Sequence, residues 1–185
     1  MNNIINWLLK PFKNCLSYLW LLFLLISTID IYDLVKNNLI PYAIYIGFHG
    51  YITAYTFCIL GQILPTKYNT IYKTIILIVA IVCFIIDSFC QLMYGSRFSQ
   101  DFAVIFMQTN ISEIKEYIES YISMNHVFSI VAILFTFIGL YYTIKRLSIF
   151  LGEKTYYISL IGVVIGTVLS IRNPSIYNDV FIGKI

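Results

Sequence analysis

Hydrophobic residues fall into five long, almost uncharged runs, and most polar residues lie between them. The runs cover residues 15–29, 39–60, 74–93, 126–144 and 155–171. A helix needs roughly 20 residues to cross a membrane core of about 30 Å. The runs are too long and too little alternating for barrel strands, and open strands would leave backbone groups unpaired in lipid. The pattern therefore predicts an all-α fold, a five-helix transmembrane bundle.

Composition agrees with this class. Hydrophobic residues make up 59% of the 185 residues and charged residues 11%, whereas soluble domains average about 45–50% hydrophobic and 25% charged residues.

The first and fifth runs are short and need snorkelling ends or a locally thinned bilayer. The first run follows two lysines, as a secretory signal would, but no small-x-small cleavage motif follows it. We therefore expect a retained anchor.

The distribution of Lys and Arg predicts a cytoplasmic N-terminus. This orientation places seven of the twelve basic residues inside, Lys10, Lys13, Lys67, Lys73, Lys145, Arg146 and Lys154. Residues 94–125 and the C-terminus then face outward, which for a bacterial inner membrane means the periplasm. The net charge of +3 fits basic segments at an anionic leaflet and gives no reason to invoke nucleic acid.

The polar stretch of residues 94–125 is the most informative part of the chain. Asn110 is a residue type that caps helices, and Glu113 follows it by three positions, as in a capping box. The helix predicted after it is apolar on one side and polar on the other, with Ile111, Ile114, Ile118, Tyr121 and Ile122 against Glu113, Glu116 and Ser120. We expect an amphipathic helix lying on the membrane surface, in the outer loop between the third and fourth spans.

Two interpretations of this motif remain open. As a capping box, Asn110 and Glu113 would stabilise the helix by about 1 kcal/mol. Alternatively, Thr109 and Glu113 form a polar pocket at headgroup depth, because both can hydrogen-bond an ammonium or a phosphate-linked headgroup. The interpretations are compatible, since a carboxylate held by a cap is already oriented for a ligand.

These features resemble a known family. Tyr94-Gly95, an aromatic residue at Phe98, and the Thr-x-x-x-Glu spacing of Thr109 and Glu113 are similar to the bacterial phosphoethanolamine transferases that modify lipid A and lipopolysaccharide core. The five spans and the long outer loop extend the resemblance over the whole chain. Members of that family add a periplasmic, sulfatase-like domain, in which zinc and a threonine nucleophile transfer phosphoethanolamine from phosphatidylethanolamine.

The resemblance implies a division of the chain. Residues 1–172 would be the transmembrane domain, and residues 173–185 the start of a linker to a periplasmic catalytic domain absent from this chain. Within the linker, Asn173-Pro174 and Gly183-Lys184 are similar to the family's connecting stretch.

The implied function is presentation of the phosphatidylethanolamine donor for transfer to lipid A or a core sugar, without catalysis by this chain alone. Thr109 and Glu113, with Asn110 beside them, are the expected substrate-binding residues, although Ile105 stands where relatives often have Asn. His49 and His126 are the two histidines, and no Asp/His cluster has zinc spacing. Zinc and the nucleophile are therefore expected in the catalytic domain, supplied in cis or in trans.

The alternative is a stand-alone multipass membrane scaffold or lipid-binding protein, which the absence of every catalytic element favours.

The four cysteines, Cys15, Cys58, Cys83 and Cys90, fall in or beside apolar runs. We interpret them as small packing residues, with a disulfide or metal pair as the other possibility.

Overall fold

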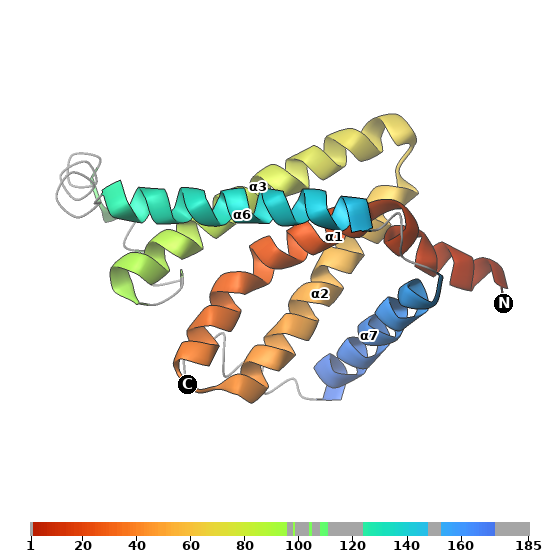
Figure 1. The fold of residues 1–185 in the computed structure, drawn as a ribbon, viewed down its shortest axis with the longest axis horizontal. Coiled ribbons are helices and arrows are strands. Elements are labelled where there is room, and N and C mark those ends of the chain that lie inside the picture. The colour runs from red at the N-terminus through yellow and green to blue at the C-terminus, as the bar shows by residue number, and fades with distance from the viewer. Residues whose placement is uncertain are drawn as a thin grey trace.

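The computed structural model describes residues 2–95, 98, 104, 108–110, 124–147 and 153–172, and the regular structure in these residues is helical. The helices are α1 (Asn2–Lys36), α2 (Ile40–Ile63), α3 (Thr66–Tyr94), α6 (Met124–Leu147) and α7 (Glu153–Arg172), as Figure 1 shows. Each helix contains one of the five apolar runs, apart from Leu39 of the second run, which is the N-cap of α2. The prediction of an all-α helical bundle is confirmed.

Four of these helices, α1, α2, α3 and α6, are long and apolar enough to cross a membrane. The apolar stretch of α7, Tyr156–Val168, is shorter. At about 1.5 Å per residue, a stretch of this length does not reach across a core of about 30 Å. The chain is therefore a multipass membrane protein with four full-length candidate spans, and α7 is a helix whose apolar part is shorter than a span.

Helix α1 begins at Asn2, well before the predicted start at residue 15. Leu9 and Phe12 are buried whereas Lys10 and Lys13 are exposed, so this extension is amphipathic and its lysines lie on the outer face. The backbone leaves helical geometry at Cys15 (φ −137°, ψ 18°), one turn after Pro11. Proline lacks an N–H and crowds the turn before it, so Pro11 weakens the helix around residues 7–11, and the break itself lies one turn later at Cys15. In Figure 1 the red N-terminal part of α1 diverges from the remainder of the helix.

Helix α1 contacts each of the other four described helices, and its contact with α2 follows a stripe of small residues. The stripe recurs every three or four positions along α2, at Ala43, Gly47, Gly50, Ala54 and Cys58. A Cβ atom added at Gly50 would overlap the Ser27 hydroxyl oxygen and lie 3.1 Å from the Ser27 Cβ. Small residues let helix backbones approach closely in lipid, where packing drives association.

A tight turn joins α1 to α2. The Leu39 N–H donates to the Leu34 carbonyl (2.8 Å) and the Asn38 N–H donates to the Val35 carbonyl (3.0 Å). Asn38 has a positive φ of 60°, which asparagine tolerates better than most residues. Pro41 lies in the first turn of α2, where a missing N–H removes no helical bond. The two helices therefore run antiparallel along the small-residue stripe.

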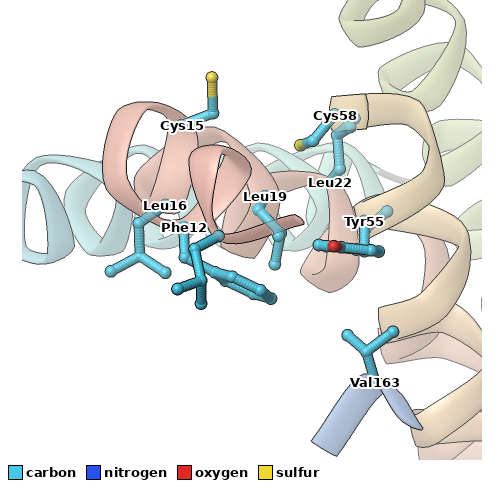
Figure 2. Close-up of a cluster of buried hydrophobic side chains, with 10 residues drawn as sticks. Phe12, Cys15, Leu16, Leu19, Leu22, Tyr55, Cys58 and Val163 are labelled. Atoms are coloured by element: carbon cyan, nitrogen blue, oxygen red, sulfur yellow. The ribbon is translucent and has the colours of Figure 1, made fainter. Parts of the chain in front are cut away.

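The main core lies where α1, α2 and α7 meet (Figure 2). The rings of Phe12 and Tyr55 stack with centroids 5.1 Å apart, and the Tyr55 hydroxyl donates to the Leu8 carbonyl (2.8 Å). Val163 of α7 completes the cluster. In Figure 2 the Cys15 side chain points away from Phe12 and Leu16, toward the opposite side of α1.

A second core joins α1 to α3 and α6 through Leu25, Phe84 and Phe137. Phe84 and Phe137 lie with ring centroids 5.3 Å apart. Phe137 is the buried residue of α6, while Phe128 and Phe135 on that helix are each 69% exposed. An apolar helix that exposes most of its surface is suited to lipid rather than to water.

Two predictions lie outside the described residues, the amphipathic helix of the outer loop and the linker at residues 173–185.

None of the four cysteines forms a disulfide, and Cys15, Cys58 and Cys90 are buried. These three fit the interpretation as packing residues. Cys83 is exposed on the apolar surface of α3.

Candidate functional site

The structure describes two of the three predicted site residues. Thr109 is half-buried and Asn110 is exposed, and each has an interaction partner. Glu113 lies outside the described residues, so the Thr109–Glu113 pocket stays a prediction. Tyr94 ends α3 and is exposed, as is Phe98.

Polar side chains meet at the end of the bundle from which the Thr109 segment continues. Asp33 lies in the last turn of α1, and Gln91 lies in the last turn of α3. The Gln91 amide nitrogen Nε2 donates to Asp33 Oδ1 (3.3 Å), and the Asn37 amide nitrogen Nδ2 donates to the same oxygen (3.4 Å). Because two amides point at one carboxylate oxygen, the orientation of Asp33 is set by both helices.

Gly95 shapes the exit from α3. It adopts the left-handed conformation (φ 67°) and its N–H donates to the Gln91 carbonyl (3.1 Å), which is a common glycine cap. The Gln91 Nε2 also lies 3.4 Å from the Gly95 carbonyl oxygen. Gln91 therefore joins the cap of α3 to the carboxylate on α1.

Two buried polar atoms at this end have no hydrogen-bond partner among the described residues, Gln91 Oε1 and Ser88 Oγ. Gln91 is 8% exposed and Ser88 is 2% exposed. A buried polar atom without a partner costs about 1–3 kcal/mol. A ligand that donates hydrogen bonds here would remove that cost.

The charges at this end are mostly negative. Asp30, Asp33 and Asp87 lie here, with Lys36 as the basic residue at the end of α1. Asp30 and Asp87 each have an interaction partner. Asp33 accepts hydrogen bonds from two neutral amides, and no basic group in the described part of the chain forms an ion pair with it. This carboxylate can therefore bind an ammonium group at low desolvation cost, because it is half-buried and already oriented.

Zinc does not fit the described part of this chain. The described helices and loop residues hold no group of three or more His, Cys, Asp or Glu side chains placed to bind a metal ion. Zinc ordinarily takes three or four such ligands from the protein. The chemistry available at this end is recognition of a cation by a carboxylate and amides.

Sequence analysis did not single out Asp33 or Gln91. One available signal was topological, because the ends of the first and third spans lie on the same side of a bundle whose spans alternate in direction. Polar residues at those two ends were therefore candidates for contact. Comparison with known protein families, with curated proteins and with solved structures found no match for this chain.

Proposed function

We propose that this chain is the membrane domain of a phosphoethanolamine transferase, and that the Asp33–Gln91 end receives the headgroup of the phosphatidylethanolamine donor. The observation that carries the proposal is the Asp33 carboxylate, held by two amides at the end of the bundle that leads to Thr109 and Asn110. The Tyr94-Gly95 pair and the Thr-x-x-x-Glu spacing support the same assignment.

The chemistry of the headgroup fits this arrangement. Phosphatidylethanolamine ends in a primary ammonium that has three N–H donors, which a carboxylate binds through short charge-assisted hydrogen bonds. Phosphatidylcholine carries the same net charge, but its nitrogen is fully methylated and donates none. Asp33 and the neighbouring Gln91 Oε1 are both acceptors, so they favour the first lipid over the second.

The remaining parts of the reaction lie elsewhere. A catalytic domain, supplied in cis or in trans in the periplasm, would provide the nucleophile and zinc, and would pass phosphoethanolamine to lipid A or a core sugar. This chain would be in the inner membrane with a cytoplasmic N-terminus. Its own contribution is to bind and orient the donor, with Thr109, Asn110 and Glu113 as polar contacts to the headgroup.

Lipid selectivity tests the binding step. The full chain is purified in detergent and titrated with short-chain phosphatidylethanolamine or phosphatidylcholine, and native mass spectrometry gives each apparent Kd. Asp33→Asn keeps an acceptor oxygen for Asn37 and Gln91 while it removes the charge. We expect this variant to lose about tenfold or more of the preference for phosphatidylethanolamine. Lys36→Gln alters an exposed charge in the same turn of α1 and should leave the preference unchanged.

Transfer tests the enzymatic assignment. Membranes containing the chain and a sulfatase-like catalytic domain are supplied with labelled phosphatidylethanolamine and lipid A. Thr109→Ala combined with Glu113→Ala should cut transfer while protein level is unchanged, and full activity of that double variant would refute the predicted pocket. Selective binding of phosphatidylethanolamine without transfer by any such domain would instead identify a lipid-binding protein.

A further inference from the structure

A second polar cluster lies at the opposite end of the bundle, where α2 turns into α3. The Lys73 ammonium nitrogen Nζ lies 3.0 Å from Cys15 Sγ and 5.8 Å from the centroid of the Tyr18 ring. The Tyr18 hydroxyl donates to the backbone carbonyl of Lys73 (2.9 Å). These contacts hold the lysine against the kink of α1.

Lys73 has no acidic partner in the described part of the chain. The Lys73 ammonium contacts a thiol and an aromatic ring, and the aspartates of α1 and α3, Asp30, Asp33 and Asp87, all lie toward the other end of these helices. An ammonium has three N–H donors, and a thiol sulfur is a weak acceptor for one of them. A half-buried cation normally requires a counter-charge, and no side chain in the described part of the chain supplies one to Lys73.

The neighbouring side chains add uncharged polar groups. The Tyr72 hydroxyl, Asn69 Oδ1 and Gln62 Nε2 are buried and have no hydrogen-bond partner among the described residues. Asn69 and Tyr72 both pack on Gly61, since a Cβ atom there would lie 3.2 Å from Asn69 Oδ1 and from the Tyr72 ring. The turn between α2 and α3 therefore encloses donors and an acceptor that no described residue satisfies.

The cluster lies at the depth of lipid headgroups. Cys15 begins the first apolar run, Cys58 lies two residues from the end of the second, and Lys73 directly precedes the third. Cys15 and Cys58 belong to one buried cluster, and Lys73 Nζ lies 3.0 Å from Cys15 Sγ, so the ends of these three runs lie together in space. Phosphate is the anion found at this depth of a bilayer.

We propose that Lys73 and Tyr72 form a binding site for a phosphate group, the Lys73 ammonium supplying the charge and the Tyr72 hydroxyl a directed hydrogen bond. Asn69 Oδ1 adds an acceptor, which suits a headgroup that carries a hydroxyl beside its phosphate, such as phosphatidylglycerol. The site is separate from the Asp33–Gln91 end and does not depend on the transferase assignment. The phosphate comes either from a lipid of the bilayer or from the solvent.

Native mass spectrometry of the full chain in detergent distinguishes these sources. The probes are short-chain phosphatidylglycerol, inorganic phosphate and short-chain phosphatidylcholine. Lys73→Gln should weaken binding of phosphatidylglycerol, or of inorganic phosphate where that is the ion bound, about tenfold or more, because it removes a charge-assisted hydrogen bond to the phosphate. Lys67→Gln is the matched control, since Lys67 lies in the first turn of the same helix and is exposed. It should leave binding unchanged.

Tyr72→Phe is a second variant that removes one hydroxyl and retains the ring that packs on Gly61. It should weaken phosphate binding severalfold without loss of folding. Binding of phosphatidylglycerol alone identifies the lipid as the source, and equal binding of inorganic phosphate identifies the solvent ion. Equal losses in Lys67→Gln and Lys73→Gln would overturn the proposal, because they would indicate a diffuse effect of charge. Unchanged binding in both Lys73→Gln and Tyr72→Phe would also overturn it.

Discussion

The close approach of α1 and α2 at Gly50 gives a sharp test of the fold. In Gly50→Ala the new methyl group would overlap the Ser27 hydroxyl oxygen, which a rotation of that side chain relieves. The Ser27 Cβ, however, lies 3.1 Å from the new atom and is fixed to the backbone. The two helices must therefore separate slightly along the small-residue stripe.

The cost can be worked out by comparison with a glycine in open space. Overpacking costs about 1–3 kcal/mol, and the fixed Ser27 Cβ places Gly50→Ala in the upper part of that range. Replacing Gly by Ala within a helix stabilises the folded state by about 1 kcal/mol, because alanine has the higher helix propensity. A Cβ atom at Gly139 of α6 would meet nothing within 4 Å, so Gly139→Ala gains the propensity term alone. Gly50→Ala should be less stable than Gly139→Ala by about 2–3 kcal/mol.

The free energy of unfolding of each variant is measured on the purified chain in mixed micelles, with steric trapping as the method that detects unfolding. Ser27→Gly added to Gly50→Ala removes the hydroxymethyl group of α1 that the new methyl group of α2 would meet. The double variant should be more stable than Gly50→Ala, although Ser27→Gly alone is destabilising, because neighbouring residues couple. If Gly50→Ala and Gly139→Ala agree within about 0.5 kcal/mol, the close packing of α1 on α2 is wrong.

Three further predictions use the same unfolding measurement. Tyr55→Phe removes the hydrogen bond to the Leu8 carbonyl and should cost about 1 kcal/mol; no loss would argue against this contact. Phe137→Ala should cost about 3–5 kcal/mol, whereas Phe135→Ala, at a residue 69% exposed, should cost less than about 1 kcal/mol; equal costs would contradict the packing of α6. Gly95→Ala should cost about 1 kcal/mol because φ is 67° there, and Gly95→Asn should cost less; the reverse order would refute the left-handed cap.

The helices could be predicted from the sequence because each depends on a local property, a long run without charge. The start of α1 was missed for the same reason. Lys10 and Lys13 end the uncharged run, yet both point outward while Leu9 and Phe12 point into the core. The helical spacing of these four residues predicts an amphipathic helix, whereas mean hydropathy does not, because the two lysines lower it.

The polar ends of the bundle could not be predicted in the same way. Gln91 meets Asp33 and Lys73 meets Cys15 across 58 residues of sequence in each case. Which residues face each other across such a separation depends on how α3 packs on α1, and side-chain volume along the whole interface decides that. The Thr109–Glu113 spacing is local and was visible, but local spacing does not reveal which groups of α1 and α3 lie nearby.

The spacing of the two polar ends links them to the membrane. Eighteen residues separate Lys73 from Gln91 on α3, and eighteen separate Cys15 from Asp33 on α1. At about 1.5 Å per residue each interval is about 27 Å, close to the thickness of the hydrocarbon core. Between the ends the contacts of α1 with α3 are apolar, through Leu25 and Phe84. The α1–α3 pair therefore holds a carboxylate at one membrane surface and an ammonium at the other, and sliding one helix along the other would break both polar contacts together.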